Sequence, residues 1–383
     1  MKLECTKKLL DYLGVKPEKT TSESAESDPL CAWTANLLTL NRRKAIVAVN
    51  PASRCMFVLY GITAKNIPKI PELILEGIRQ MLKSEYIRPE IIENYLDDCG
   101  RTVEFSPNSS RAVITVCNQA CERVQRFQNI FEAGDLYQYP LLPWLNNDLH
   151  PKAGYRYTYE VLGELLQEKY GEKIRGCRAV ELEVKLELPT PCTRTLIVPA
   201  DMNFYQLHQI LQGAFEWHDE HLHQFVLENK RDKPAVIVRP DKPEEDFMVP
   251  DGFENILPEF MRQEILNSMN TRVGEVFTAY KKIVYEYDFG DGWTHIIKLK
   301  KFIEDCENPY PHCIKAVGEA PEEDCGGYWG FADKSEILKN PEHEEYEELC
   351  EWLGMKWWQP TDAERINRKI SCRYRVCMPV RYE

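Results

Sequence analysis

The chain contains 383 residues, enough for two or three domains with their own cores. Hydrophobic residues make up 43% of it and aromatic residues 11%, which is typical of a globular protein, and no apolar run approaches the roughly 20 residues that span a bilayer. Because the first residues lack the apolar segment of a secretory signal, the sequence predicts a cytoplasmic protein without membrane interaction. Most of its 14 dispersed cysteines are then expected to be reduced and buried.

The formal net charge of −13 is distributed unevenly along the chain. Residues 1–150 contain 18 basic and 18 acidic side chains, whereas residues 201–360 contain 16 basic and 33 acidic ones, a net charge of −17. The last 23 residues carry 6 basic and 3 acidic side chains. Proteins that bind duplex nucleic acid use Lys and Arg to displace counterions from phosphates. The charge pattern therefore disfavours nucleic acid as the partner of the acidic region.

Residues 1–131 predict a small α+β domain. The first 14 residues have the apolar spacing of a short amphipathic helix, and a strand signal surrounds Trp33. Strands at 45–49 and 55–60, joined by a turn of the Asn-Pro type, predict a hairpin.

Two helices and a further strand are expected to complete this first domain. Pro71 and Pro89 each open a helix, since proline is well placed in a first helical turn. Residues 112–117 are predicted to be a strand and residues 119–131 a helix.

Residues 132–177 predict a linker that contains one short helix at 159–170. Its first half is rich in Pro, Asn and Gly, which are typical of connections. At the other end of the chain, residues 356–383 are predicted to be a basic C-terminal tail.

Residues 178–355 predict a second α+β domain, a β-grasp-like or roll-type mixed sheet with flanking helices. Strands at 180–188 and 195–198 come first, and a helix follows that is expected to be capped by Asp201. A strand at 222–227 comes next. The long acidic excursion after it is expected to contain one helix near 259–268, and an acidic helix is predicted at 342–353.

Residues 281–300 are the segment on which this second domain is expected to be organised. Two alternating strands are joined by Phe289-Gly290-Asp291-Gly292, in which the glycines can adopt positive φ. A turn this short fixes the register of its strands. The fixed register is predicted to hold four chemically capable side chains near one end of the sheet, namely Asp288, Asp291, Trp293 and His295.

Three unusual segments of this domain occur in a distinctive order: AFEWHDEHLHQF (214–225), YEYDFGDGWTHIIKL (285–299) and CIKAVGEAPEEDCGGYWGF (313–331). On these segments the chain resembles the plasmid pRiA ORF-three-like family, which also occurs as TnpR-like passenger proteins of insertion elements. The resemblance implies a compact α+β domain and an association with mobile elements, and it assigns no catalytic residue. Residues 30–130 also resemble a small uncharacterised domain that can precede this one.

A histidine cluster, HDEHLH, is the first candidate for chemistry. His221 and His223 share a face if this segment is extended, and two imidazoles with a carboxylate such as Asp288, Asp291 or Glu323 can bind zinc. The alternative is that these histidines pack between helix and strand. No cofactor is therefore predicted, and a divalent metal on His221, His223 and Asp288 is the alternative.

Two further motifs allow either a structural or a chemical role. The DFGDG turn lacks the other motifs of a kinase, so Asp288 and Asp291 are expected to accept backbone hydrogen bonds rather than hold Mg²⁺. In PEEDCGG, the acidic neighbours Glu323 and Asp324 oppose thiolate formation at Cys325, which favours packing over nucleophilic catalysis. Aromatic side chains surround these motifs and are either core or contact surface: Trp217, Tyr285, Tyr287, Trp293, Tyr328 and Trp329.

The sequence leads to three functional hypotheses. The first is a binding or adaptor protein whose acidic, aromatic-edged second domain captures a protein or peptide partner. The second is a metal-dependent hydrolase or nuclease that uses His221, His223, Asp288, Asp291, His295 and Glu323. The third, a mobile-element DNA factor, comes from the resemblance alone. The candidate pocket consists of His221, His223, Tyr285, Asp288, Asp291, Trp293, His295, Glu323, Asp324 and Cys325, and the oligomeric state is left open.

Overall fold

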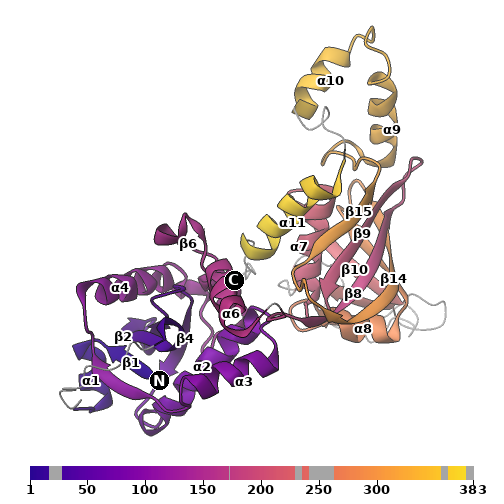
Figure 1. Ribbon diagram of the computed structural model, residues 1–383. Helices are drawn as coiled ribbons and strands as arrows, with labels where there is room; N and C mark the ends of the chain where they lie inside the picture. Colours follow the sequence, from indigo (N-terminus) through magenta and orange to yellow (C-terminus); the bar gives the residue numbers. More distant parts are fainter. Residues whose placement is uncertain (17–27, 172, 229–234, 241–262, 355–360, 377–383) are drawn as a thin grey trace. The chain divides into compact units, whose positions relative to one another are not determined.

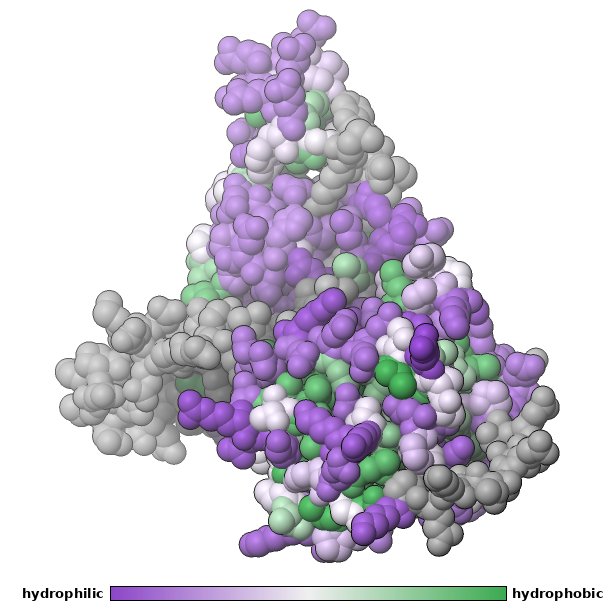
Figure 2. All heavy atoms as spheres, turned by 90° about the vertical axis from the view of Figure 1, so that its left-hand side faces the viewer, coloured by the Kyte–Doolittle hydropathy of each residue, from purple (hydrophilic) through white to green (hydrophobic). Residues whose placement is uncertain are grey.

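The computed structural model describes residues 1–16, 28–171, 173–228, 235–240, 263–354 and 361–376 (Figure 1). The chain forms two compact units, Met1–Gly176 and Cys177–Glu383, each with its own sheet and core. The predicted α+β architecture with two domains is thus confirmed. Within the described ranges, every helix is too short or too polar to cross a bilayer. On the face drawn in Figure 2, hydrophilic residues cover most of the surface and hydrophobic residues form patches between them.

The first unit is built on a five-stranded sheet in the order β4-β3-β2-β1-β5. Three strands form an antiparallel meander, and β1 then pairs in parallel with both β2 and β5. The sequence pattern predicted the hairpin at 45–60 but not β1, because four residues are too few to show the alternation of a strand. The strands are β1 (Lys2–Cys5), β2 (Ala32–Leu40), β3 (Arg43–Val49), β4 (Met56–Ile62) and β5 (Glu104–Pro107).

Helices cover both faces of this sheet, so alternate strand residues enter two separate cores. On β3, for example, Ile46 and Ala48 face the core of α1, α2 and α3, while Val47 and Val49 face that of α4. Cys31 is joined to Cys99 by a disulfide, and the other described cysteines are free. The helical elements are α1 (Lys7–Leu13), η1 (Pro29–Cys31), η2 (Ile67–Lys69), α2 (Ile70–Ser84), α3 (Pro89–Asp98), α4 (Arg111–Arg126) and η3 (Gln128–Ile130).

The strand predicted at 112–117 is wrong, because these residues form the first half of α4. The run of β-branched residues there favours a strand locally. The Ser110 hydroxyl instead accepts a hydrogen bond from Val113 N and caps a helix. Cys117, Ala120 and Val124 then lie on one face that packs on the sheet, so tertiary packing overrides the local preference.

The interval 132–177, predicted as a linker, packs into the first unit. Leu142, Leu162 and Ile174 are buried in its core. Asn146, which is fully buried, donates to Met56 O and accepts from Met56 N, so this segment is hydrogen-bonded to β4. Its elements are η4 (Tyr139–Leu141), α5 (Leu142–Leu145), β6 (Leu149–His150), η5 (Pro151–Ala153), β7 (Arg156–Tyr157) and α6 (Thr158–Tyr170).

The second unit contains an eight-stranded mixed sheet in the order β12-β11-β10-β13-β14-β8-β9-β15. All neighbouring strands are antiparallel except β11 and β12. The hairpin predicted at 281–300 is confirmed as β13 and β14 and lies at the centre of the sheet. The strands are β8 (Cys177–Leu186), β9 (Cys192–Pro199), β10 (His223–Glu228), β11 (Ala235–Arg239), β12 (Gln263–Asn267), β13 (Lys282–Tyr287), β14 (Trp293–Cys306) and β15 (His312–Val317).

Helix α7 packs on this sheet and supplies much of its core. Its N-cap is Asn203, which forms a reciprocal capping box with Gln206, and not the predicted Asp201. The helix predicted near 259–268 is wrong in its described part, since Gln263–Asn267 forms β12; its first residues lie outside the described ranges. The helices are α7 (Phe204–Phe215), α8 (Val273–Ala279), α9 (Gly327–Ile337), α10 (Tyr346–Leu353) and α11 (Ala363–Val376).

The described part of the predicted basic tail is helix α11, which packs against α7 and β15. Ile366 and Ile370 are fully buried in the core of the second unit. The helix backbone can approach closely because Gly213 has no side chain, and an added Cβ would lie 3.1 Å from Ile370 Cα. The arginines of this helix then bind the C-terminal end of α7 and the residues after it, through Arg365 to Glu216 and Arg373 to Trp217 O.

Candidate functional site

Three segments converge near the ends of β10 and β13. Asp288 N donates to Leu222 O at 2.9 Å, which joins the end of the hairpin to the segment before β10. The loop before α9 is attached by two more hydrogen bonds: His218 N donates to Glu323 Oε2 at 2.7 Å, and Gly326 N donates to Asp291 Oδ2 at 3.2 Å. The segments that the sequence singled out therefore lie side by side.

The hairpin turn sets the position of Asp288. Its backbone adopts φ of +53°, and its Oδ1 accepts from Gly290 N at 2.9 Å and Asp291 N at 3.2 Å. The carboxylate thus accepts hydrogen bonds from two backbone N–H groups that have no other partner within the turn. These bonds fix the orientation of the carboxylate. Glu216, Asp219 and Asp324 also have positive φ, so all four described non-glycine residues of the second unit with this conformation are acidic residues in these segments.

The three segments need a glycine where they meet. Gly327 has φ of +65°, and a Cβ there would lie 2.7 Å from Asp291 O. Any side chain would force the turn and the start of α9 apart.

Glu323 holds the loop before α9 against the sheet. Only 7% exposed, it accepts hydrogen bonds from the Tyr287 hydroxyl through Oε1 and from His218 N through Oε2. Burial, together with the hydrogen bond to this carboxylate, raises the pKa of Tyr287 well above its usual value. The phenol therefore stays protonated and acts as a donor.

A second polar network lies beneath, between α7 and β13. His208 Nε2 lies 2.6 Å from Asp219 Oδ1, and its Nδ1 lies 2.8 Å from the Tyr285 hydroxyl, which also accepts from Gln212 Nε2 at 3.1 Å. With a proton on Nε2, His208 donates to Asp219 and can accept from the Tyr285 hydroxyl at Nδ1, so each of these groups has a partner. Burial opposes ionisation of Asp219, but the hydrogen bonds from His208 and Gln209 hold the pKa of its carboxyl below the usual range.

His223 belongs to this second network. Its ring stacks on that of His208 with centroids 3.5 Å apart and planes 4° apart. His208, Asp219 and His223 bring ligand atoms within 4.8 Å of one another. However, both His208 nitrogens already contact other groups, and lone pairs in parallel, stacked rings do not converge on one ion. The arrangement is thus better suited to packing than to metal binding.

His221 lies at the outer edge, next to two carboxylates. Its Nε2 is 3.0 Å from Asp324 Oδ1 and 3.7 Å from Asp288 Oδ2. The side chains differ in exposure: 10% for Asp288, 28% for His221 and 64% for Asp324. The predicted grouping of His221 with Asp288 is therefore present, but Asp324 takes the place that the sequence gave to His223.

His295 is remote from this edge. Fully buried, its ring contacts Phe215, Trp217 and Tyr285 at centroid distances between 4.5 and 5.2 Å. Burial lowers the pKa of His295 to about 3, so the ring is neutral at physiological pH. Trp293 is buried in the same aromatic core, 6.0 Å from the Trp217 ring centre.

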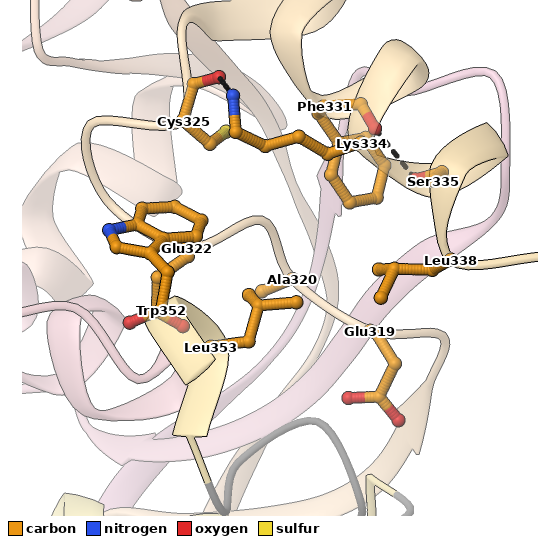
Figure 3. A pocket seen from close by; sticks show the side chains of 10 residues that line it. All are labelled: Glu319, Ala320, Glu322, Cys325, Phe331, Lys334, Ser335, Leu338, Trp352 and Leu353. Carbon is orange, nitrogen blue, oxygen red and sulfur yellow. Dashed lines mark hydrogen bonds between the residues drawn. The ribbon is translucent and has the colours of Figure 1, made fainter. Parts of the chain in front are cut away.

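Cys325 is also buried, and its thiol is not activated. Burial and the nearby Asp291 carboxylate raise the pKa of Cys325 to about 12. The thiol lies at one wall of a groove of about 450 Å³ that is open to solvent (Figure 3). Lys334 crosses this groove and donates to Cys325 O at 3.1 Å. The other lining residues are Glu319, Ala320, Glu322, Phe331, Ser335, Leu338, Trp352 and Leu353.

Exposed aromatic side chains lie where the segments meet solvent. Trp329 is 80% exposed, Phe289 45% and Tyr328 40%. Tyr328 and Trp329 contact each other edge to face at 5.0 Å. The Gly326–Asp291 hydrogen bond joins the hairpin turn, which carries Phe289, to the start of α9, which carries Tyr328 and Trp329.

The buried network is carried by residues that the sequence patterns did not single out: His208, Gln212 and Asp219. One signal was present: His208 and Gln212 are four residues apart on the otherwise apolar face of a predicted helix. Polar side chains on such a face need partners, and here those partners are supplied by Tyr285 and Asp219.

Two families match parts of the chain. The plasmid pRiA4b ORF-3-like proteins match residues 178–367, and a domain of unknown function (DUF6933) matches residues 2–161. This arrangement confirms both expected resemblances.

The matched relatives carry names that state no activity. The uncharacterized protein y4hQ of Sinorhizobium fredii (strain NBRC 101917 / NGR234) is 31% identical over 195 residues, which is 50% of this chain and 90% of that protein. Among solved structures, a protein of unknown function, MM3350 from Methanosarcina mazei Go1, has 26% sequence identity and a TM-score of 0.40. The match covers 49% of this chain and 96% of that one.

Proposed function

The chain belongs to the plasmid pRiA4b ORF-3-like family through its second unit, and for that unit we propose a binding function: capture of a basic peptide segment of a partner protein. The proposed contact surface, called here the acidic aromatic rim, consists of Phe289, Asp291, Asp324, Tyr328 and Trp329. The observation that carries the proposal is the exposure of three aromatic rings in segments that also carry the carboxylates of Asp291 and Asp324.

The exposed aromatic rings support binding rather than packing. A tryptophan with 80% of its surface in water gains nothing from the core of its own domain. Trp and Tyr are the residues that most often dominate protein contacts when a partner covers them. The edge-to-face contact of Tyr328 with Trp329 limits the motion of both rings, so less entropy is lost on binding.

The charge of the surface defines the partner. Asp324 is 64% exposed in its side chain, and residues 201–360 carry a net charge of −17. Lys and Arg side chains are attracted both by carboxylates and by the faces of Trp and Tyr. A segment that contains Lys or Arg is therefore the ligand that suits this rim.

The segments that carry the rim are held by hydrogen bonds and by the sheet. Glu323 accepts hydrogen bonds from the Tyr287 hydroxyl and from His218 N, and the hairpin lies at the centre of the sheet. A surface held in this way is preorganised, so little of the contact free energy is lost in ordering it.

A metal-dependent hydrolase or nuclease is the second candidate, and the approach of His221 to Asp288 favours it. Its other expected residues lie elsewhere: His295 is in the core, His223 stacks on His208, and Glu323 is bonded to Tyr287. This distribution favours binding over catalysis for the second unit.

The test uses a fluorescein-labelled Lys/Arg-rich peptide, with a Glu-rich peptide and a Gly/Ser peptide for comparison. We expect fluorescence anisotropy to report binding of the basic peptide, which weakens as salt is added. Trp329→Ala is expected to reduce the affinity roughly 5- to 30-fold, since a contact of this kind contributes about 1–2 kcal/mol.

The matched control is Tyr155→Ala, which removes a 68% exposed aromatic side chain from the first unit. It is expected to leave the affinity unchanged. Equal binding of all three peptides, or equal effects of the two substitutions, would contradict the proposal.

A further inference from the structure

We propose that His221, Asp288 and Asp324 form a binding site for one divalent transition-metal ion, with Zn²⁺ as the reference ion. This inference does not rest on the proposed peptide capture. Asp324 belongs to both the site and the acidic aromatic rim, but metal binding is argued from the geometry of the three ligands and is measured without peptide.

The distances between the ligand atoms fit a single ion. Zinc binds His nitrogen at about 2.0–2.1 Å and carboxylate oxygen at about 2.0–2.2 Å, so two ligands of a tetrahedral ion lie roughly 3.3 Å apart. His221 Nε2 lies 3.0 Å from Asp324 Oδ1 and 3.7 Å from Asp288 Oδ2. All three ligand atoms are within 4.8 Å of one another, so small side-chain rotations suffice.

The Asp288 carboxylate is held as a metal ligand needs to be. Its Oδ1 accepts from Gly290 N and Asp291 N, which fixes the plane of the group. Its Oδ2 accepts no hydrogen bond from a described residue, although the side chain is 90% buried, and it faces His221. In metal sites, a ligating carboxylate typically accepts hydrogen bonds at one oxygen while its other oxygen binds the ion.

The His221 imidazole supplies an independent indication. Its Nε2 is shielded from solvent and makes no hydrogen bond to any described residue, although it lies 3.0 Å from Asp324 Oδ1 and 3.7 Å from Asp288 Oδ2. A shielded polar atom without a hydrogen bond is costly unless something else satisfies it. An ion between Nε2 and the two carboxylates would do so.

The charge and composition of the group select the kind of ion. Two carboxylates offset the charge of a divalent cation, and among the described residues no Lys or Arg forms an ion pair with either of them. One nitrogen and two oxygens suit zinc or manganese better than magnesium or calcium, which prefer oxygen alone. Three protein ligands leave a fourth position, which opens to solvent where Asp324 is exposed.

Among the described residues, a second group of suitable composition is His208, Asp219 and His223, and it serves as the internal comparison. Both nitrogens of His208 contact other groups, and its ring is stacked on that of His223. If metal binds there instead, substitutions at the proposed site leave the affinity unchanged.

The experiment measures Zn²⁺ binding to the full-length chain, purified without a histidine tag and kept reduced, by equilibrium dialysis and by the rise in thermal midpoint with added Zn²⁺. Asp324→Asn is the principal variant, because Asn keeps the size of the side chain and also tolerates the φ of +59°. We expect one tightly bound ion per chain in the wild type and at least about 100-fold weaker binding in the variant.

Asp288→Asn is the second variant and is expected to lose Zn²⁺ affinity to the same extent. Asp333→Asn is the control, since Asp333 is exposed on α9 and is not one of the three proposed ligands. The control is expected to bind as the wild type does. Free cysteines also bind zinc, so the number of ions bound per chain does not by itself identify the site. The loss of Zn²⁺ affinity in Asp324→Asn is the result that identifies it. Wild-type affinity in that variant, or no stoichiometric binding by the wild type, overturns the proposal.

Discussion

Replacing His295 by Leu is expected to make the second unit less sensitive to acid. In the folded protein this imidazole is fully buried among Phe215, Trp217 and Tyr285, and burial lowers its pKa to about 3. In the unfolded chain its pKa is about 6.5. At pH values between these two pKa values, the unfolded state binds more protons than the folded state does. The free energy of unfolding therefore rises as the pH increases across this range and decreases as the pH falls.

The magnitude follows from the difference between the two pKa values. Each pH unit within the window changes the free energy of unfolding by about 1.4 kcal/mol. Protonation of the unfolded chain begins near pH 6.5, so this one histidine should cost about 2 kcal/mol between pH 7 and pH 5. Leucine cannot bind a proton and has a similar volume, so His295→Leu should lack this contribution.

The assay is urea unfolding of the wild type and His295→Leu at pH 7, 6 and 5. A difference in packing changes the free energy of unfolding of the variant by the same amount at each pH. The diagnostic quantity is therefore how the difference in free energy of unfolding between wild type and variant changes with pH. If His295→Leu loses as much stability as the wild type between pH 7 and pH 5, the reasoning about a buried neutral imidazole is refuted.

Two further substitutions test how the site is held together. Tyr287→Phe removes the hydroxyl that donates to Glu323 and should lower the free energy of unfolding by about 2 kcal/mol, because a buried acceptor is left without its donor. A loss below about 0.5 kcal/mol in urea unfolding would mean that water satisfies the carboxyl oxygen. Gly327→Ala should lower the thermal midpoint more than Gly292→Ala, because both glycines have positive φ but only at Gly327 does a Cβ meet backbone, namely Asp291 O at 2.7 Å. Equal shifts in the two variants would contradict this close approach.

Local patterns in the sequence were sufficient for the central elements of the fold. The short turn with its two glycines predicted the hairpin, and the structure pairs Tyr285 with His295 and Tyr287 with Trp293 across it. These features depend on neighbouring residues only, which is why periodicity and turn chemistry predict them. The same reasoning failed for 112–117, where packing of a capped helix on the sheet outweighed strand preference.

The arrangement of the site was decided by tertiary structure. His221 and His223 are two residues apart, and an extended segment was expected to place them on one face, yet one faces Asp324 and the other stacks on His208 of a different element. Likewise, the interval 132–177 has the composition of a linker, but Leu142 and Leu162 meet a core that no local pattern reveals. Sequence by itself determines which residues share a strand face or a turn, whereas contacts between distant segments depend on how whole elements pack, because that packing maximises burial of apolar surface over the entire chain.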